Sequence, residues 1–296
     1  MRFMNFLLFS ALIQHKEDIS KVVEELGPAL THKDVEIRLK GTKFLSDLLR
    51  SLPHELLDAN QLTFITQFYC DRMKDHHSIA PQVVIGLNAI VKMKSLPRES
   101  PALILQQLFA HIPCQSQVRG DRANIFTLIQ HLSDNFQPEL EAMGADFIYG
   151  VIQAVESERD PRNLVFLFEF MPRFIKTFSL RHLIEEMFEV FSCYFPIDFH
   201  PSPNDPQGIT RDALAEKLSP CLVASPKFAE FCYPLVLEKL EGDLKIAKLD
   251  SLNVLVSLFV SQFLVTTLIL FASRSKLRQV SKIPRCSSIL MPSGMH

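Results

Sequence analysis

The sequence contains no tryptophan and only nine glycines among its 296 residues. Scarce glycine, together with many leucine, phenylalanine, isoleucine and glutamate residues, favours helices over a turn-rich β architecture. Basic residues are not in excess either, since the formal net charge is −2. A chain that binds nucleic acid along its length usually carries a basic excess, so we expect no direct contact with nucleic acid.

Motifs of catalysis and of metal binding are missing as well. The sequence has no glycine-rich phosphate loop, no GxSxG and no HExxH, so we predict that the protein is not an enzyme and uses no cofactor. Asp75-His76-His77 is interpreted as a polar turn, because adjacent histidines chelate poorly without further ligands. The six cysteines form no CxxC pair, which favours a reducing compartment. Three cysteines lie in apolar stretches of the sequence and are predicted to be core residues: Cys193, Cys221 and Cys232. An iron–sulfur carrier is an alternative that rests on these three cysteines alone.

What the sequence does contain is a repeat. Hydrophobic residues make up 47% of the chain, enough for a folded core. Short polar breaks that hold an aspartate recur at intervals of 38 to 46 residues, at Asp34, Asp75, Asp121, Asp160, Asp205 and Asp243. A period of about 40–47 residues with two helices per unit is typical of HEAT and armadillo repeats.

The apolar residues between these breaks follow helical spacing. Ile37, Gly41, Phe44, Leu45 and Leu48 obey the i, i+3, i+4, i+7 rule, and each unit divides into two such segments. One helix pair cannot hide its apolar face alone, so successive pairs stack. We therefore predict an all-α, right-handed HEAT-repeat solenoid of about six helix pairs. It would occupy residues 1–255, followed by a divergent apolar and then basic tail over residues 256–296.

The residues at the polar breaks are predicted to be structural. Aspartates there would cap the second helix of a unit, and arginines would bridge to the next unit. The acidic turn at Glu156, Glu158 and Asp160 is interpreted as a solvated helix end. Gly41 and Gly86 are placed where neighbouring helices approach closely. The predicted cap and turn residues are Asp34, Arg38, Asp75, Asp121, Asp160 and Arg162.

A proline-rich insert, residues 191–209 (FSCYFPIDFHPSPNDPQGI), interrupts the fifth unit between its two helices. Four prolines within eleven positions exclude a continuous helix. Its aromatic first half is too apolar to lie free, so we expect it to fold back on the solenoid. Residues 200–208 are polar and expected to be exposed, as in loops that carry function. The partner-binding candidates are Tyr194, Phe195, Asp198, Asn204, Asp205 and Gln207.

Both ends of the chain leave alternatives open. Residues 1–14 are apolar after one arginine, which fits an amphipathic first helix or a signal peptide. Near the other end, 23 consecutive residues after Asp250 carry no charge and basic residues follow, so residues 253–272 are a candidate membrane anchor. A truncated isoform or a fragment is the other explanation. In that case Leu255, Leu258, Phe259 and Phe263 would lie on an uncovered face, and we expect poor solubility.

Several segments resemble the MMS-nineteen family in collinear order between residues 22 and 255. They are RMKDHH at 72–77, MGADF at 143–147, ERDPRNL at 158–164, EEMFEVFSCYFPIDFHPSPNDPQGI at 185–209, PKFAEF at 226–231 and AKLDSL at 247–252. The irregular insert makes the resemblance specific, because helical periodicity alone would not produce it.

This resemblance implies a non-catalytic adaptor of the cytosolic iron–sulfur protein assembly machinery. Its expected partners are subunits of the targeting complex and apo-proteins of DNA repair, replication and transcription, such as helicases, polymerases and primase. The expected localisation is cytoplasm and nucleus. The alternative is a generic α-solenoid interaction scaffold, tethered to a membrane through residues 253–272.

Overall fold

The computed structural model describes residues 18–201 and 208–260, and these residues form helices and turns with no strand among them. A further helix covers residues 245–260. The labelled α-helices are α2 (Ile19–Leu30), α3 (Val35–Ser51), α4 (Ala59–Arg72), α5 (Ala80–Ile90), α6 (Ser100–His111), α7 (Arg119–Asn135), α8 (Gln137–Glu141), α9 (Ala145–Val155), α10 (Pro161–Thr177), α11 (Ile184–Ser192), α12 (Arg211–Leu222) and α13 (Ala229–Glu241). Two 3₁₀ turns, η1 (Cys114–Ser116) and η2 (Pro226–Phe228), complete the set.

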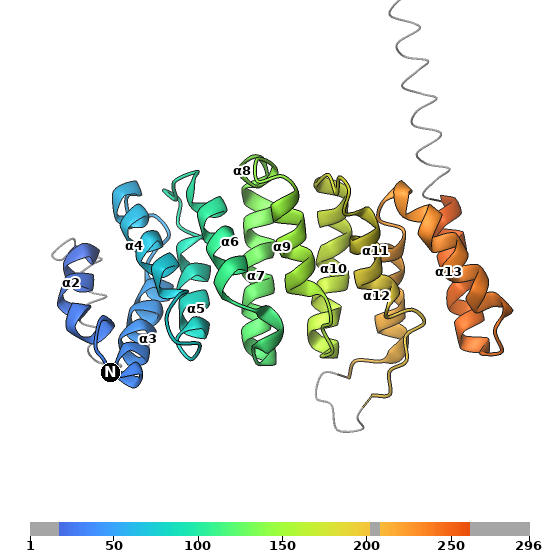
Figure 1. The fold of residues 1–296 in the computed structure, drawn as a ribbon, viewed down its shortest axis with the longest axis horizontal. Helices are drawn as coiled ribbons and strands as arrows, with labels where there is room; N and C mark the ends of the chain where they lie inside the picture. Colours follow the sequence, from blue (N-terminus) through green and yellow to red (C-terminus); the bar gives the residue numbers. More distant parts are fainter. Residues whose placement is uncertain (1–17, 202–207, 261–296) are drawn as a thin grey trace, which may run out of the picture.

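The helices stack in two layers along one axis, as Figure 1 shows. The first helix of each pair packs against the first helix of the next, in the order α2, α4, α6, α9, α11, α13. The second helices form the other layer, in the order α3, α5, α7, α10, α12. Each layer hides the apolar face that the other would expose, so the predicted all-α helical-repeat solenoid is confirmed.

Helix starts are set by aspartates where the sequence breaks. The carboxylate of Asp34 accepts a hydrogen bond from the backbone N–H of Glu36 over 2.9 Å and caps α3. Asp58 and Gln61 form a reciprocal capping box at the start of α4. Each cap satisfies backbone donors that have no partner within the helix, and so fixes where the helix begins.

Glycines permit close contact between neighbouring helices, as predicted for two positions. A Cβ atom on Gly86 would lie 2.1 Å from the buried ring of Tyr69, so only glycine leaves room for that ring. The Tyr69 hydroxyl lies 2.8 Å from the hydroxyl of Ser46, which joins α4 to α3. A Cβ on Gly41 would approach Leu30 to 3.2 Å. Both expectations are confirmed.

The structure departs from the predicted two helices per unit in the fourth unit. Three helices, α8, α9 and α10, stand there, because Gly144 has φ = 67° and separates α8 from α9. Glycine adopts this left-handed conformation without the strain that a side chain would add. The chain therefore turns between α8 and α9 where periodicity alone indicated continuity.

The last helix presents a different face from the one expected. Leu258 was predicted to lie uncovered, but it is buried, together with Ala247, Ser251 and Val254, which share its helical stripe. Leu255 is half-buried, and Phe259 is exposed as predicted. The other exposed apolar side chains of this helix are Ile246, Leu249, Leu252, Val256 and Val260. No helix in the described ranges is long and apolar enough to cross a bilayer, and the candidate anchor at 253–272 lies mostly outside them.

Candidate protein-interaction surface

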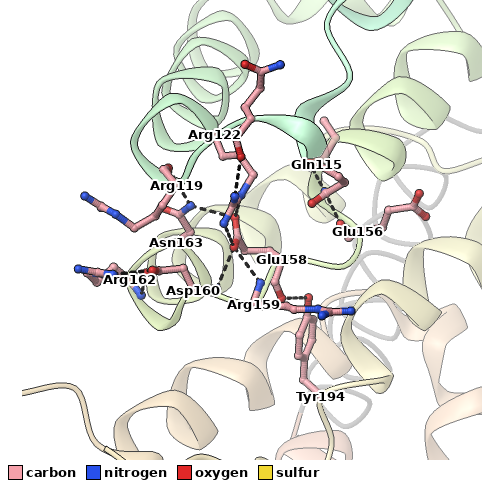
Figure 2. Close-up of polar contacts among 12 residues, drawn as sticks. Gln115, Arg119, Arg122, Glu156, Glu158, Arg159, Asp160, Arg162, Asn163 and Tyr194 are labelled. Atoms are coloured by element: carbon pink, nitrogen blue, oxygen red, sulfur yellow. Dashed lines mark hydrogen bonds and ion pairs between the residues drawn. The ribbon is translucent and has the colours of Figure 1, made fainter. Parts of the chain in front are cut away.

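A buried carboxylate organises the turn that precedes α10. The Glu158 side chain is 0% exposed, and Arg122 in the first turn of α7 donates to both of its oxygens, over 2.7 Å from Nε and 2.6 Å from Nη2 (Figure 2). The backbone N–H groups of Arg159 and Asp160 donate to the same carboxylate over 2.8 Å each. The side-chain amide of Asn163 donates over 2.9 Å. The prediction that Glu158 is solvated is therefore wrong, because α7 supplies its counter-ion.

The electrostatics of this turn follow from its hydrogen bonds. Burial alone would raise the pKa of Glu158, but the hydrogen bonds from Arg122, from the backbone of Asp160 and from Asn163 lower it below its usual value. The hydrogen bond to Glu158 is the main cause that raises the pKa of Arg122. Both groups therefore stay charged. Removing one partner of a buried pair typically costs about 3–5 kcal/mol, so the pair fixes how α7 and α10 meet.

The network reaches the fifth unit through Tyr194. Its hydroxyl donates to the backbone oxygen of Glu158 over 2.7 Å (Figure 2). Its ring meets Phe168 edge-on at 5.6 Å between centroids. Asn163 also donates to the backbone oxygen of Arg119 over 3.2 Å. Three successive units thus converge on one turn, and ERDPRNL, one of the segments that carry the family resemblance, forms that turn.

Bridges of this kind recur with the repeat period. In each, an arginine of one second helix pairs with a carboxylate of the next unit, 36 to 39 residues further along the chain. All six side chains are at most 16% exposed. The pairs are Arg38 with Asp75, Arg122 with Glu158, and Arg211 with Asp250. Their recurrence indicates a structural role in stacking the units.

Asp160 and Asp121 lie at helix starts, and Asp75 lies in the turn between α4 and α5. Asp160 caps α10 and accepts from the backbone and the guanidinium of Arg162. Asp75 accepts from Arg38 and Arg72; burial would raise its pKa, but the Arg38 hydrogen bonds and charge lower it. Asp121 lies in the first turn of α7, where burial raises its pKa. These residues hold helices and units together.

The base of the insert is anchored while its tip projects. Phe195 and Ile197 are buried, and the peptide bond between Phe195 and Pro196 is cis. The side chain of Asp198 is 92% exposed, and that of His200 94%. The candidates Asn204, Asp205 and Gln207 lie outside the described residues. Of the partner-binding candidates that are described, Asp198 is the one available to a partner, since Tyr194 and Phe195 pack against the solenoid.

A hollow of about 380 Å³ opens beside this base. The buried Phe195 and Ile197 line it on the insert side, and the Arg211–Asp250 pair forms part of its wall. Asp212 and Glu216 of α12 stand exposed at the same hollow. The insert thus contributes to a small cleft between α12 and the helix at 245–260.

The cysteines of the described ranges are protonated core residues with one exception. Cys221 is fully buried and its thiol donates to the backbone oxygen of Phe168 over 3.4 Å. Burial raises the pKa of Cys232 to about 12, while Cys193 is exposed.

No group of three histidine, cysteine or acidic side chains in the described ranges could hold a metal ion. The rings of His76 and His77 lie 4.1 Å apart between centroids at a tilt of 36°, and His76 contacts Ser78.

The fold and the site define a helical-repeat solenoid whose units are joined by arginine–carboxylate bridges and whose regular array carries one irregular insert. A family model described as "Dos2-interacting transcription regulator of RNA-Pol-II" (MMS19_N) matches residues 23–271. The chain is 52% identical over 238 residues to the MMS19 nucleotide excision repair protein of Drosophila melanogaster, covering 80% of this chain and 25% of that protein.

Further relatives give the same result. The Mus musculus homologue is 40% identical, with 80% of this chain and 23% of the relative aligned. The Dictyostelium discoideum homologue is 32% identical, with 82% and 22% aligned. The chain belongs to the MMS19 family. It spans about a quarter of the length of the relatives that it matches.

Glu158 and Arg122 were not among the predicted site residues. Glu158 lies in an acidic turn that the sequence analysis interpreted as solvated, and Arg122 was not singled out among the arginines at the polar breaks. A usable signal was their separation of 36 residues, close to that of Arg38 and Asp75 at 37. Aligning the repeats on arginines as well as aspartates would have paired them.

Proposed function

We propose that this chain is a protein-binding platform of an adaptor that helps deliver iron–sulfur clusters to apo-proteins of DNA repair, replication and transcription. Membership of the MMS19 family is the observation that carries the proposal, because relatives are named for nucleotide excision repair. The family description also names an interacting protein, which supports a role in protein binding. The chain itself would perform no catalysis.

The architecture suits such a role. A solenoid offers an extended surface on which several side chains of a partner can be engaged at once. The inter-unit bridges hold neighbouring helices in register, so a partner meets a preformed surface and little ordering is required on binding. The proposed partners are subunits of the iron–sulfur targeting complex and apo clients such as DNA helicases, polymerases and primase. The proposed locations are cytoplasm and nucleus.

A binding experiment with purified proteins tests this proposal. The chain is immobilised and presented with the apo form of an excision-repair helicase or a polymerase client, with a full-length relative immobilised in parallel. We expect both surfaces to capture the client. Capture by the full-length relative but not by this chain would show that clients bind other repeats, and would refute the client-binding role of this portion.

A variant of the insert tests whether the insert contacts the client. Asp198→Ala together with His200→Ala alters the exposed side of the insert without touching its buried base. Loss of capture in this variant would assign client contact to the insert, whereas unchanged capture would assign it to another surface of the solenoid.

A further inference from the structure

The two helix layers differ in charge. The first helices of the pairs, α2, α4, α6, α9, α11 and α13, carry ten acidic side chains against three basic ones. The second layer, with the helix at 245–260, carries thirteen basic against eight acidic side chains. The first layer therefore presents a net negative field, and segments rich in lysine or arginine are the ones that it attracts.

Two adjoining hollows lie in this acidic layer, on either side of an outward stripe of α9. Tyr149 and Gln153 on this stripe line both hollows, and Tyr149 is 56% exposed. The hollow toward α6 has a volume of about 380 Å³, and the hollow toward α11 about 290 Å³. We call the two together the Tyr149 groove. Small binding pockets in proteins begin at about 300 Å³, so each hollow fits one side chain of a partner and the groove fits a short segment.

The hollow toward α6 has an apolar floor. Leu108 and Ile112 are buried beneath it, and the ring of Phe109 lies against the backbone of α9. A Cβ on Gly150 would stand 2.1 Å from that ring, so glycine is what allows the ring to lie flat there. The side-chain amide of Gln115 donates to the backbone oxygen of Ala154 over 3.2 Å and closes one end. A bulky apolar side chain is the group that this floor would bind.

Carboxylates surround both hollows. The lining includes four acidic residues and no lysine, arginine or histidine. None of the four forms an ion pair within the described part of the chain, whereas the bridging carboxylates of the turns are all paired. The acidic lining residues are Asp146, Glu156, Glu186 and Glu189. Charge complementarity therefore favours a cationic side chain next to the apolar side chain that the hollow toward α6 would bind.

We propose that the Tyr149 groove docks a protein segment in which a bulky apolar side chain enters the hollow toward α6 and a lysine or arginine reaches Glu186 and Glu189 beside the other. Packed helices are about 8–10 Å apart, and an extended chain advances about 3.3 Å per residue. The cationic residue accordingly stands about three positions from the apolar one. This inference deepens the proposed adaptor role and rests on it for the origin of the partner.

Fluorescence anisotropy with defined peptides tests the groove directly. The probe is a fluorescein-labelled decapeptide with a Phe-Leu pair, two serines and then Lys-Arg-Lys. One comparison peptide replaces Phe-Leu by Ser-Ser, and another replaces Lys-Arg-Lys by three glutamates. We expect the probe to bind and both comparison peptides to bind at least about tenfold more weakly, with affinity falling as salt is raised. Equal binding of the probe and the Ser-Ser peptide would overturn the proposal.

Two groove variants and two matched variants locate the contact. Tyr149→Ser and the pair Glu186→Gln with Glu189→Gln change exposed side chains of the groove, so we expect the fold to be preserved. Phe64→Ser, at a 48% exposed aromatic residue of α4, and Glu230→Gln with Glu241→Gln, in α13, make equivalent changes elsewhere in the same layer. Each groove variant should weaken the probe about tenfold, and the matched variants less than about twofold. Equal weakening by both sets would show unspecific attraction and refute the site.

A client experiment separates this inference from the proposed function. The wild-type chain and the Tyr149→Ser variant are each presented with a purified apo helicase client. Loss of capture in the variant supports the groove as a client site. Capture by both refutes the groove as the client site and leaves the adaptor role standing, whereas capture by neither refutes the client-binding role of this chain.

Discussion

The turn before α10 and the base of the insert are joined by the hydrogen bond from Tyr194 to Glu158, yet they combine polarity and burial in opposite ways. The turn is highly charged and holds its central carboxylate at 0% exposure. The insert is rich in aromatic residues and presents Asp198 at 92% exposure. The difference lies in the partners: the preceding unit brings Arg122 to the turn, whereas the ionic neighbour of Asp198 among the described residues is an exposed histidine. Whether a charged side chain is buried thus depends on whether the neighbouring unit supplies a counter-ion for it.

Among the substitutions considered for the two regions, replacing Glu158 by alanine should lower the free energy of unfolding most. The substitution leaves the guanidinium of Arg122 buried without its carboxylate and removes the acceptor of two backbone N–H groups. We expect a loss of about 3–5 kcal/mol in the free energy of unfolding. Urea denaturation followed by circular dichroism measures it. Glu156→Ala is the matched control in the same turn, with an expected change within about 0.5 kcal/mol; equal effects of the two would refute the distinction between buried and peripheral acids.

The stacked helix pairs could be predicted from the sequence, but the burial of Glu158 could not. Helix periodicity and the spacing of Asp34, Asp75 and Asp160 indicated stacked helix pairs with capped starts, because these signals are local. Burial of Glu158 depends on a side chain 36 residues away, and that pairing follows from stacking, which no local pattern contains. Likewise, the break at Gly144 reflects a turn that hydrophobic spacing does not encode.

Acid should remove the contribution that Glu158 makes to the free energy of unfolding. The pKa of Glu158 is lowered in the folded state, so its contribution to stability is complete above its usual value near 4.5 and is lost as pH falls through the folded-state pKa. Arg122→Gln removes the largest of the causes that lower this pKa and keeps the burial that raises it. We therefore expect the variant to lose less stability than the wild type as pH falls below about 4.5. Urea midpoints measured across that range give the two slopes, and equal slopes would contradict the assignment.

The hydrogen bond between the two regions can be removed alone. Tyr194→Phe deletes the hydroxyl that donates to the Glu158 backbone oxygen over 2.7 Å and retains the ring that meets Phe168. We expect a loss of about 0.5–1.5 kcal/mol, the usual net value of such a bond. Amide hydrogen exchange should rise in residues 195–201 and stay constant in α4. Unchanged exchange in the insert base would show that the aromatic packing of Phe195 and Ile197 holds it without the bond.

The smallest effect is expected at Asp198. Its carboxylate is exposed and its one described ionic neighbour, His200, is exposed too, so water replaces any interaction that the substitution removes. Asp198→Ala should change the free energy of unfolding by less than about 0.5 kcal/mol, several-fold less than Glu158→Ala. Urea denaturation of the two variants side by side measures the ratio. A loss at Asp198 that matched the loss at Glu158 would mean that the insert depends on this carboxylate for its anchoring, and the contrast between the two regions would disappear.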